Sequence, residues 1–303
     1  MALTKIHTAR REKYGLIDFM GDISRLIKFR LTALVVVTSL MAYGIVLAGP
    51  FDMTLFLLLA FGGFSITSAA NILNEMLEKR EDALMKRTKN RPIAADKLSV
   101  TNAMIMAGVL ILIGVLLLTM ISLLTALLSM ISLVIYAFIY TPLKRYSSIS
   151  ITIGAIPGAM PMLIGCVAAQ GSFTVMAIVL FGVQFLWQFP HFLAIAFLGA
   201  EDYKNAGFNN VPRKNGEVDR SIGLHATIYS LLLAGLIIIP YFLGYIDMQG
   251  VILAFAFSLL YLFTALNFHL KFDRKSALIM MFSSFVYLPI ILYVFLQFKS
   301  LVI

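Results

Sequence analysis

Nine long apolar runs constrain what this chain can fold into. Each holds about 20 residues, the length that an α-helix needs to cross the hydrocarbon core of a bilayer. Because 60% of the 303 residues are hydrophobic, a soluble fold is excluded. The sequence therefore predicts an all-α polytopic membrane protein with nine transmembrane helices. The runs are roughly 31–48, 54–73, 102–120, 121–141, 150–169, 173–198, 222–245, 250–270 and 276–297.

The basic residues lie almost entirely on one side of this alternation. Of the 24 lysines and arginines, all but Lys299 precede the first run or fall in alternate connections between runs. By the positive-inside rule, that side faces the cytoplasm or its equivalent in an organelle. We therefore expect the tail 1–24 and the long loops 79–101 and 199–221 to be cytosolic, with the carboxyl end on the opposite face.

Composition also bounds the domain, the compartment and the partners. We expect residues 25–303 to form one transmembrane domain, in a bacterial cytoplasmic membrane, because Glu12 and Asp18 are unlike a mitochondrial presequence. The net charge of +9 follows from the membrane bias, so no nucleic-acid partner is expected. A basic face suits anionic membrane lipid or a phosphorylated substrate. Cys166 is the only cysteine, which excludes an intramolecular disulfide and a Cys-x-x-Cys-His haem attachment site.

A polar stripe ends the second apolar run. Asn71, Asn74, Glu78 and Asp82 are spaced three, four and four residues apart, which on a helix places them along one face. Amide and carboxylate oxygens on one face suit Mg²⁺, which also bridges to substrate phosphates. The alternative is a solvated helix end with alternating charges. The two asparagines favour a site, because polar groups at membrane depth usually face a cavity.

A second acidic cluster follows the sixth run. Glu201 and Asp202 lie on the same predicted face of the membrane as the first stripe, and Arg213 and Lys214 come shortly after them. Alone, this cluster is typical of an ordinary loop. Together, the two clusters indicate acidic patches that face each other across a basic-lined cavity. Such a pair suits a Mg²⁺-diphosphate whose apolar tail lies between the helices.

These motifs resemble the UbiA-type intramembrane prenyltransferases, typified by the 4-hydroxybenzoate prenyltransferase of the ubiquinone pathway. Within that family, the chain is similar to the branch that farnesylates protohaem IX, the haem O synthases. The resemblance covers most of residues 25–297, and the third matching segment separates the haem branch from the others. The matching segments are 82–92, 140–145 with 153–165, 186–192, and 201–207.

Two positions depart from the family pattern. The family's first motif is an asparagine with aspartates four and eight residues later, and here Glu78 takes the middle position. A glutamate still ligates Mg²⁺ through one more methylene, so the geometry changes more than the chemistry. Phe29 stands between Lys28 and Arg30 where the family usually has proline, but both cations remain.

The resemblance implies nine helices around a central cavity and a Mg²⁺-dependent transfer of farnesyl from farnesyl diphosphate to a vinyl group of protohaem IX. The products are haem O and diphosphate. One Mg²⁺ is assigned to Asn74, Glu78 and Asp82, and a second to Asp202 with Glu201; Asn74, Glu78, Asp82 and Asp202 are the catalytic candidates. Lys28, Arg30, Arg87, Lys144 and Lys204 are the candidates for diphosphate contacts, with Arg91 and Arg145 as weaker ones.

One histidine stands apart from the others. His191 lies inside the sixth run, directly after Pro190 and one turn after Trp187. With the family resemblance, His191 is predicted to ligate or orient haem iron, and Trp187 to stack on the porphyrin. The alternative is that His191 bonds a backbone carbonyl freed by Pro190 and serves packing alone.

Two other functions stay open at this point. A related enzyme would prenylate an aromatic quinone precursor, against which the segment 190–192 argues. A transporter would place charge near the middle of the membrane, whereas here the acids cluster at the predicted cytosolic ends. For the haem branch, haem A synthase or terminal-oxidase assembly proteins are further possible partners.

Overall fold

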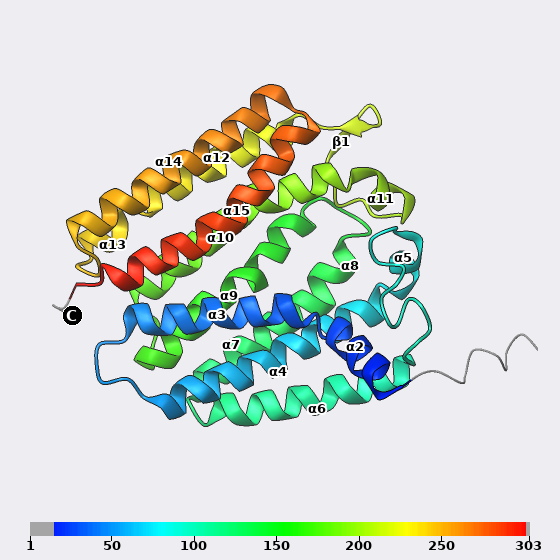
Figure 1. The fold of residues 1–303 in the computed structure, drawn as a ribbon, viewed down its shortest axis with the longest axis horizontal. Coiled ribbons are helices and arrows are strands. Elements are labelled where there is room, and N and C mark those ends of the chain that lie inside the picture. Colours follow the sequence, from blue (N-terminus) through cyan, green and yellow to red (C-terminus); the bar gives the residue numbers. More distant parts are fainter. Residues whose placement is uncertain (1–14, 301–303) are drawn as a thin grey trace, which may run out of the picture.

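Nine helical spans form a single bundle in the computed structural model, which describes residues 15–300 (Figure 1). Within that range nine helices are long and apolar enough to cross a membrane, which confirms the predicted number. The spans are α3 (Phe29–Val46), α4 (Met53–Leu77), α6 (Val100–Thr119), α7 (Leu123–Val134) continued by η1 (Ile135–Tyr140) and α8 (Thr141–Leu143), α9 (Ser150–Gln170), α10 (Val175–Leu198), α12 (Ser221–Leu236) continued by α13 (Ile239–Phe242), α14 (Met248–Lys271) and α15 (Arg274–Gln297).

The remaining elements gather at one end of the bundle. They are α2 (Leu16–Leu26), α5 (Lys79–Leu84), α11 (Ala200–Asn205) and a hairpin of β1 (Arg213–Lys214) with β2 (Glu217–Val218). This basic end lies opposite α13 and the carboxyl end of the described chain (Figure 1). Residues 1–14 of the predicted cytosolic tail lie outside the described residues. The long polar loops therefore contain short helices, turns and the hairpin, and these elements cover the ends of the spans.

Neighbouring spans pack closely where small residues face each other. The most extensive contacts join α4 to α6, α3 to α9, and α9 to α10. A Cβ atom at Gly165 of α9 would lie 2.0 Å from the Ser39 carbonyl oxygen of α3, and one at Gly158 would lie 1.9 Å from Gln188 Oε1 of α10. Membrane helices depend on such close contact, because lipid tails provide no hydrophobic drive for association. These glycines set how near α9 comes to both neighbours.

The fourth span is not a uniform α-helix. Its middle, Ile135–Tyr140, is a π-helix directly before Pro142. The Thr141 N–H donates to the Tyr136 carbonyl, five residues back, and the Thr141 hydroxyl donates to the same oxygen at 2.8 Å. Single π-turns are rare and often mark functional sites, and proline cannot donate the bond that a regular helix needs. The sequence of the run 121–141 did not predict this π-turn. The π-turn shifts the helical register and turns Thr141 toward α4.

Lys299 is the exception to the charge asymmetry, and the structure shows its role. Its ammonium donates to the Gly44 carbonyl at 3.2 Å and to the Leu47 carbonyl, both at the carboxyl end of α3. Helix ends leave carbonyls unsatisfied, and a cation there is favourable. Lys299 therefore caps a helix on the face opposite the basic end.

Candidate active site

The predicted polar stripe lies at the basic end, where α4, α5 and α8 meet. Asn74 uses both ends of its amide: Oδ1 accepts from Lys28 Nζ at 2.9 Å, and Nδ2 donates to Thr141 Oγ1 at 3.0 Å. Lys28 is placed here because it is the N-cap of α3 and takes a left-handed backbone conformation with φ 49°. Asn71 has another role, since its Nδ2 donates to Thr32 Oγ1 at 3.1 Å and ties α4 to α3.

The stripe does not run along one continuous helix. We expected a single helical face from Asn71 to Asp82, but α4 ends at Leu77 and α5 begins at Lys79. Glu78 lies at the junction with φ −99° and ψ 11°. The backbone bond from Asp82 N to Glu78 O, 2.8 Å long, still keeps the helical turn. The break bends the stripe and brings Glu78 toward α8.

Each acidic residue of the stripe is held by a cation. Glu78 pairs with Lys144 of the α8 end, and Arg91 Nη1 donates to both oxygens of Asp82 at 2.9 and 2.7 Å. Asp82 raises the pKa of the Arg91 guanidinium above its usual value, whereas burial raises the pKa of the Asp82 carboxyl group and Arg91 opposes that rise. Burial, with Arg91 nearby, lowers the pKa of Lys28 to about 7. Arg91 was only a weak candidate from sequence, yet it lies at the centre of the site.

Glu75 is a functional candidate that sequence reasoning missed. Its side chain is fully buried, at 0% exposure, and neither carboxylate oxygen has a hydrogen-bond partner among the described residues. Arg91, Lys28 and the Ile93 N–H act on it electrostatically. It escaped notice because it follows Asn74 directly and so lies off the helical stripe. A buried carboxyl group this close to Arg91 and Lys28 is therefore an additional candidate for the site.

The second acidic cluster reaches the same end but is not gathered onto the first. Glu201 is exposed, 3.3 Å from Arg213 Nη2, whereas Asp202 is partly buried. Within residues 15–300, no three His, Cys, Asp or Glu side chains form a group that could hold a metal. The chain after α11 does return to the site, because Asn209 N donates to the Lys144 carbonyl at 3.0 Å. Of the two acids, Asp202 is the less exposed, and Glu201 is paired with Arg213.

The other cationic candidates surround this core. Arg30, Arg87 and Lys204 are exposed at the basic end. Arg145, a weaker candidate, contacts Glu81 at 2.6 Å and donates to the Leu77 carbonyl at the end of α4, also at 2.6 Å. The structure therefore places Lys144 and Arg91 on the acids and Lys28 on Asn74. Arg30, Arg87 and Lys204 remain exposed.

His191 and Trp187 form a compact group against α15. Their rings stack at 5.3 Å between centroids, with 11° between the planes. Trp187 Nε1 donates to the Ser284 carbonyl at 2.9 Å, and His191 Nδ1 lies 2.7 Å from Ser284 Oγ. The partner of His191 is thus a hydroxyl of another helix, and not a carbonyl freed by Pro190.

Comparison with known proteins identifies the family. The model of the UbiA prenyltransferase family matches residues 35–287. The chain belongs to the UbiA prenyltransferase family. This UbiA prenyltransferase is 42% identical to a protoheme IX farnesyltransferase from Cytophaga hutchinsonii, over 88% of this chain and 93% of the relative.

Solved structures of this UbiA prenyltransferase's relatives have the same fold. A digeranylgeranylglyceryl phosphate synthase matches with a TM-score of 0.77 at 19% identity, over 92% of this chain and 98% of the other. A UbiA homolog from Archaeoglobus fulgidus, bound to GPP and Mg²⁺, matches with a TM-score of 0.65 at 11% identity, over 88% and 99% of the two chains. At these identities the likeness shows the fold.

The side chains of this UbiA prenyltransferase fit a hard divalent cation. Asn74, Glu78 and Asp82 offer amide and carboxylate oxygens, the ligands that Mg²⁺ prefers. The buried carboxyl group of Glu75 lies next to Asn74 in the same helix. The cations on the acids offset their charge, and they are also the side chains that bind phosphate oxygens. The site therefore places side chains that could bind a metal close to side chains that could bind phosphate.

Proposed function

We propose that this chain is a protohaem IX farnesyltransferase, which transfers farnesyl from farnesyl diphosphate to a vinyl group of protohaem IX to give haem O and diphosphate. The observation that carries the proposal is the 42% identity to a protoheme IX farnesyltransferase over nearly the whole of both chains. The buried acidic and cationic site at the basic end supports it. In the reaction the carbon–oxygen bond of the allylic diphosphate breaks, a vinyl carbon bonds to farnesyl, and water supplies the hydroxyl group and releases a proton.

Asn74, Glu78, Asp82 and Asp202 are proposed to hold Mg²⁺, with Glu75 as an additional candidate. Glu201 faces Arg213 and is the weaker ligand candidate. Mg²⁺, when bound, neutralises the negative charge that develops on the departing diphosphate. The UbiA homolog bound to GPP and Mg²⁺ supports this assignment through its shared fold.

Lys28 and Lys144 are proposed to exchange partners when the donor binds. Lys28 now lies on Asn74, and Lys144 on Glu78. With Mg²⁺ held by Asn74 and Glu78, the two ammonium groups would be free to contact the diphosphate, where they would stabilise the leaving group. The exposed Arg30, Arg87 and Lys204 are proposed to add contacts from the solvent side.

The acceptor is proposed to bind near His191 and Trp187. Ser284 Oγ donates to the Met281 carbonyl at 2.5 Å, so its hydrogen is engaged. His191 Nδ1 must then donate to Ser284 Oγ, which leaves the lone pair on Nε2. A neutral imidazole with Nε2 free is the form that ligates haem iron. This hydrogen bond fixes the ring orientation, as bonds to the second nitrogen do in other metal sites.

The basic end is proposed to face the bacterial cytoplasm. The distribution of lysine and arginine supports this orientation. Farnesyl diphosphate would then reach the site from the cytosolic side, with its isoprenoid tail among the helices. Haem A synthase or terminal-oxidase assembly proteins are the expected class of partner for haem O.

A direct assay tests the proposal. Purified protein in lipid is incubated with Mg²⁺, farnesyl diphosphate and protohaem IX, and the porphyrin products are analysed by mass spectrometry. We expect a heavier haem whose added mass equals one farnesyl group and one hydroxyl group, and none when EDTA replaces Mg²⁺. A parallel reaction with 4-hydroxybenzoate serves as the control. Prenylated 4-hydroxybenzoate with unmodified haem would overturn the proposal in favour of an aromatic acceptor.

A further inference from the structure

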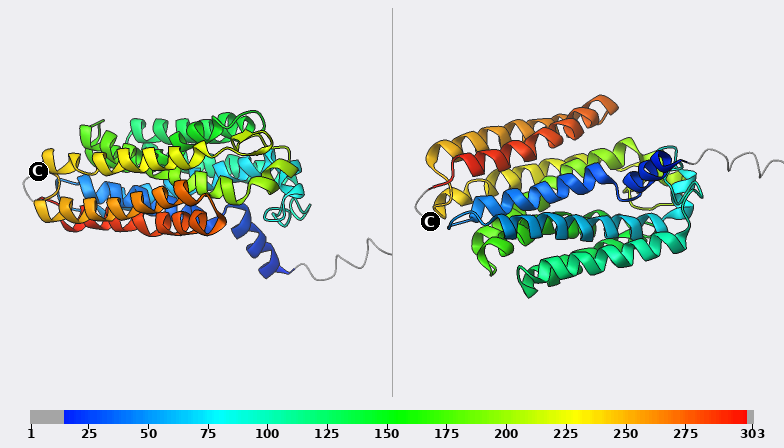
Figure 2. Two further views of the ribbon diagram at one scale, coloured as in Figure 1. Left: turned by 90° about the horizontal axis from the view of Figure 1, so that it is seen from above. Right: turned by 60° about the horizontal axis from the view of Figure 1, so that its bottom comes forward.

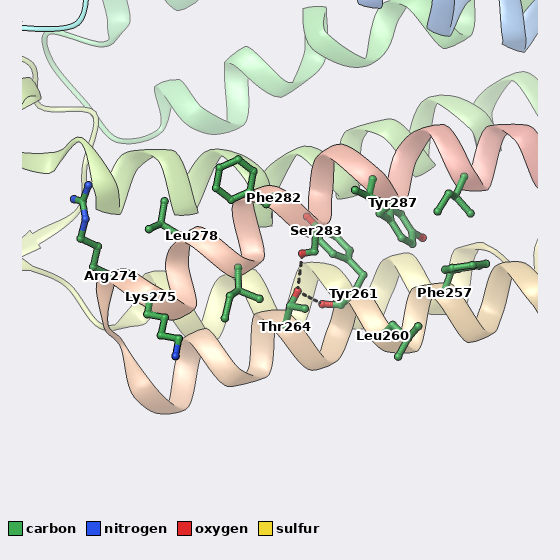
Figure 3. Close-up of a pocket in the computed structure, with 13 residues that line it drawn as sticks. Phe257, Leu260, Tyr261, Thr264, Arg274, Lys275, Leu278, Phe282, Ser283 and Tyr287 are labelled. Carbon is green, nitrogen blue, oxygen red and sulfur yellow. Dashed lines mark hydrogen bonds between the residues drawn. The ribbon is translucent and has the colours of Figure 1, made fainter.

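A groove outside the site described above runs along α14 and α15 (Figure 3). It encloses about 830 Å³ and is lined by thirteen residues of these two helices. Leu260, Phe282 and Val286 are exposed along it, so the groove opens toward the lipid that surrounds a membrane-embedded bundle. Lipid chains are the first molecules that such a surface meets.

The polar groups within the groove are already bonded to the protein. Thr264 Oγ1 and Ser283 Oγ lie 3.1 Å apart (Figure 3). The Tyr287 hydroxyl lies 2.7 Å from Ser258 Oγ. Tyr261 stacks on Tyr287 with 4.7 Å between centroids, and its hydroxyl donates to the Trp187 carbonyl at 3.3 Å. The groove therefore offers an occupant an almost purely apolar surface along its length.

Its mouth at the basic end is cationic. Arg274 and Lys275 line the groove in the first turn of α15, and Figure 3 shows both at the same end of it. The ion pairs among residues 15–300 involve neither side chain. Their neighbour Asp273 uses its carboxylate to cap α15, with Oδ1 2.7 Å from Ser276 N. Cations in the first turn oppose the helix dipole, so an anion bound between them would relieve that repulsion.

We infer that this groove binds one anionic phospholipid, with its phosphate between Arg274 and Lys275 and an acyl chain along the apolar part. The dimensions agree with a lipid of one leaflet. From Arg274 to Val286 the helix rises about 18 Å, slightly more than half of a hydrocarbon core that is about 30 Å thick. A chain that starts at the headgroup level thus reaches the middle of the bilayer within the groove.

Other amphiphiles fit less well. A Mg²⁺-diphosphate needs carboxylate ligands, and no acidic residue is among those that line the groove in the described chain. Haem needs an axial ligand, and the lining includes no histidine, cysteine or methionine. Both candidates belong instead to the sites on the other side of α15. A phospholipid requires only the two cations and the apolar surface.

Lipid in this groove would contact the helices that hold His191 and Trp187, where the acceptor is proposed to bind. Tyr261 reaches the Trp187 carbonyl, and Ser284, which holds Trp187 and His191, directly follows the groove residue Ser283. A lipid that fills the space between α14 and α15 would therefore restrict the motion of α15, the helix that holds His191 through Ser284. The lipid site itself stands on the groove and its cations, independently of the proposed reaction.

Native mass spectrometry tests the inference. The protein is equilibrated with vesicles of phosphatidylcholine that contain a minority of phosphatidylglycerol, transferred to detergent, and analysed for retained lipid. We expect one phosphatidylglycerol on the unmodified protein and roughly tenfold less on Arg274→Gln/Lys275→Gln, since each cation near anionic lipid adds affinity. The matched control is Arg80→Gln/Lys214→Gln, which removes the same charges from exposed positions at the same end. This control should retain phosphatidylglycerol.

A second pair of variants tests the groove separately from its charge. Ser283→Phe fills the middle of the groove with both cations kept, and we expect the bound lipid to be lost. Thr264→Val keeps the shape and should retain it. Equal loss of phosphatidylglycerol from Arg274→Gln/Lys275→Gln and from Arg80→Gln/Lys214→Gln would overturn the inference. It would mean that the lipid is attracted to the basic end as a whole. Three other outcomes would overturn it as well. They are equal retention of phosphatidylcholine and phosphatidylglycerol, displacement of phosphatidylglycerol by farnesyl diphosphate, and a lipid-free dimer joined through this face.

Discussion

Individual side chains of the acidic stripe are held in place before any substrate binds. Asn74 bridges Lys28 and Thr141, and Glu78 and Asp82 each have a cationic partner. Thr141 is the least expected member, since its hydroxyl donates to the Tyr136 carbonyl and thus accepts from Asn74 through a lone pair. This arrangement fixes which end of the Asn74 amide points toward the cations.

Removal of the Thr141 hydroxyl should therefore weaken metal binding at Asn74. We expect Thr141→Val to raise the Mg²⁺ concentration for half-maximal activity about five- to tenfold, because a lost hydrogen bond is worth about 1 kcal/mol. Thr141→Ser should restore most of the affinity. The measurement is a Mg²⁺ titration, followed both by turnover and by the metal-dependent rise in melting temperature. Thr38→Val is the control, since the Thr38 hydroxyl bonds within its own helix; an equal effect there would remove the special role of Thr141.

Asp202 offers a cleaner test of the acidic residues than Asp82 does. Asp82→Asn would leave Arg91 without its buried partner and cost stability as well as activity. Asp202 is partly exposed, so Asp202→Asn should lower turnover by about a hundredfold or more with an unchanged melting temperature. Glu201→Gln is the matched control, and we expect a mild effect because Glu201 faces Arg213. Turnover and thermal unfolding are measured on the same preparations, and full activity of Asp202→Asn would contradict a role for the second cluster.

Among the helices, α2 differs from every span. It is short, protrudes from the basic end of the bundle (Figure 2), and exposes Leu16, Ile17 and Met20. Its polar side carries Asp22, which is buried and lies 3.4 Å from Lys97 Nζ. An amphipathic helix with one anchored polar side and exposed apolar residues is typical of a helix that lies in the membrane interface. The predicted boundary between tail and domain, at residues 24 and 25, falls within this helix.

The depth of α2 in the membrane can be measured with single labels. In a Cys166→Ala background, a fluorophore at Met20→Cys should be quenched by brominated lipid and little affected by aqueous iodide. The same label at Asp18→Cys, about 160° around the helix, should show the opposite pattern. Equal iodide quenching at both positions would mean that α2 projects into water.

The whole molecule has one strongly basic end and one end with few charged residues. Every element outside the spans except the carboxyl-terminal residues of the described chain gathers at the basic end, and Lys299 at the other end is used to cap α3 (Figure 1). The hairpin and α11 cover part of this end of the spans, and the hairpin contains Arg213 and Lys214. This asymmetry is the physical basis for the orientation that we propose.

Labelling from the two sides of the membrane checks this orientation. In the Cys166→Ala background, cysteines at the exposed positions Asn90 and Asn209 should react with an impermeant maleimide only after the cytoplasmic side is opened. A cysteine at Met248, on the other end, should react in intact cells. Asn209 is preferable to Asn210, which is only 7% exposed. Reaction of position 90 in intact cells would reverse the orientation.

The amino-acid sequence alone was enough to predict the nine spans, the basic end and the family. Apolar length and charge distribution are summed over many residues, so they survive local irregularities such as the π-turn at Ile135–Tyr140. The spacing of Asn74, Glu78 and Asp82 also singled out these residues, although the helix breaks at Glu78.

The tertiary structure decided which residues complete the site. Thr141 and Arg91 lie 67 and 9 residues from their partners Asn74 and Asp82, so no local pattern could show that they meet. Glu75 was missed because its importance lies in its burial without partners, and burial is a property of the packed bundle. The groove between α14 and α15 likewise exists only once two helices lie side by side. Periodicity shows which face of a helix is polar, whereas packing decides what that face meets.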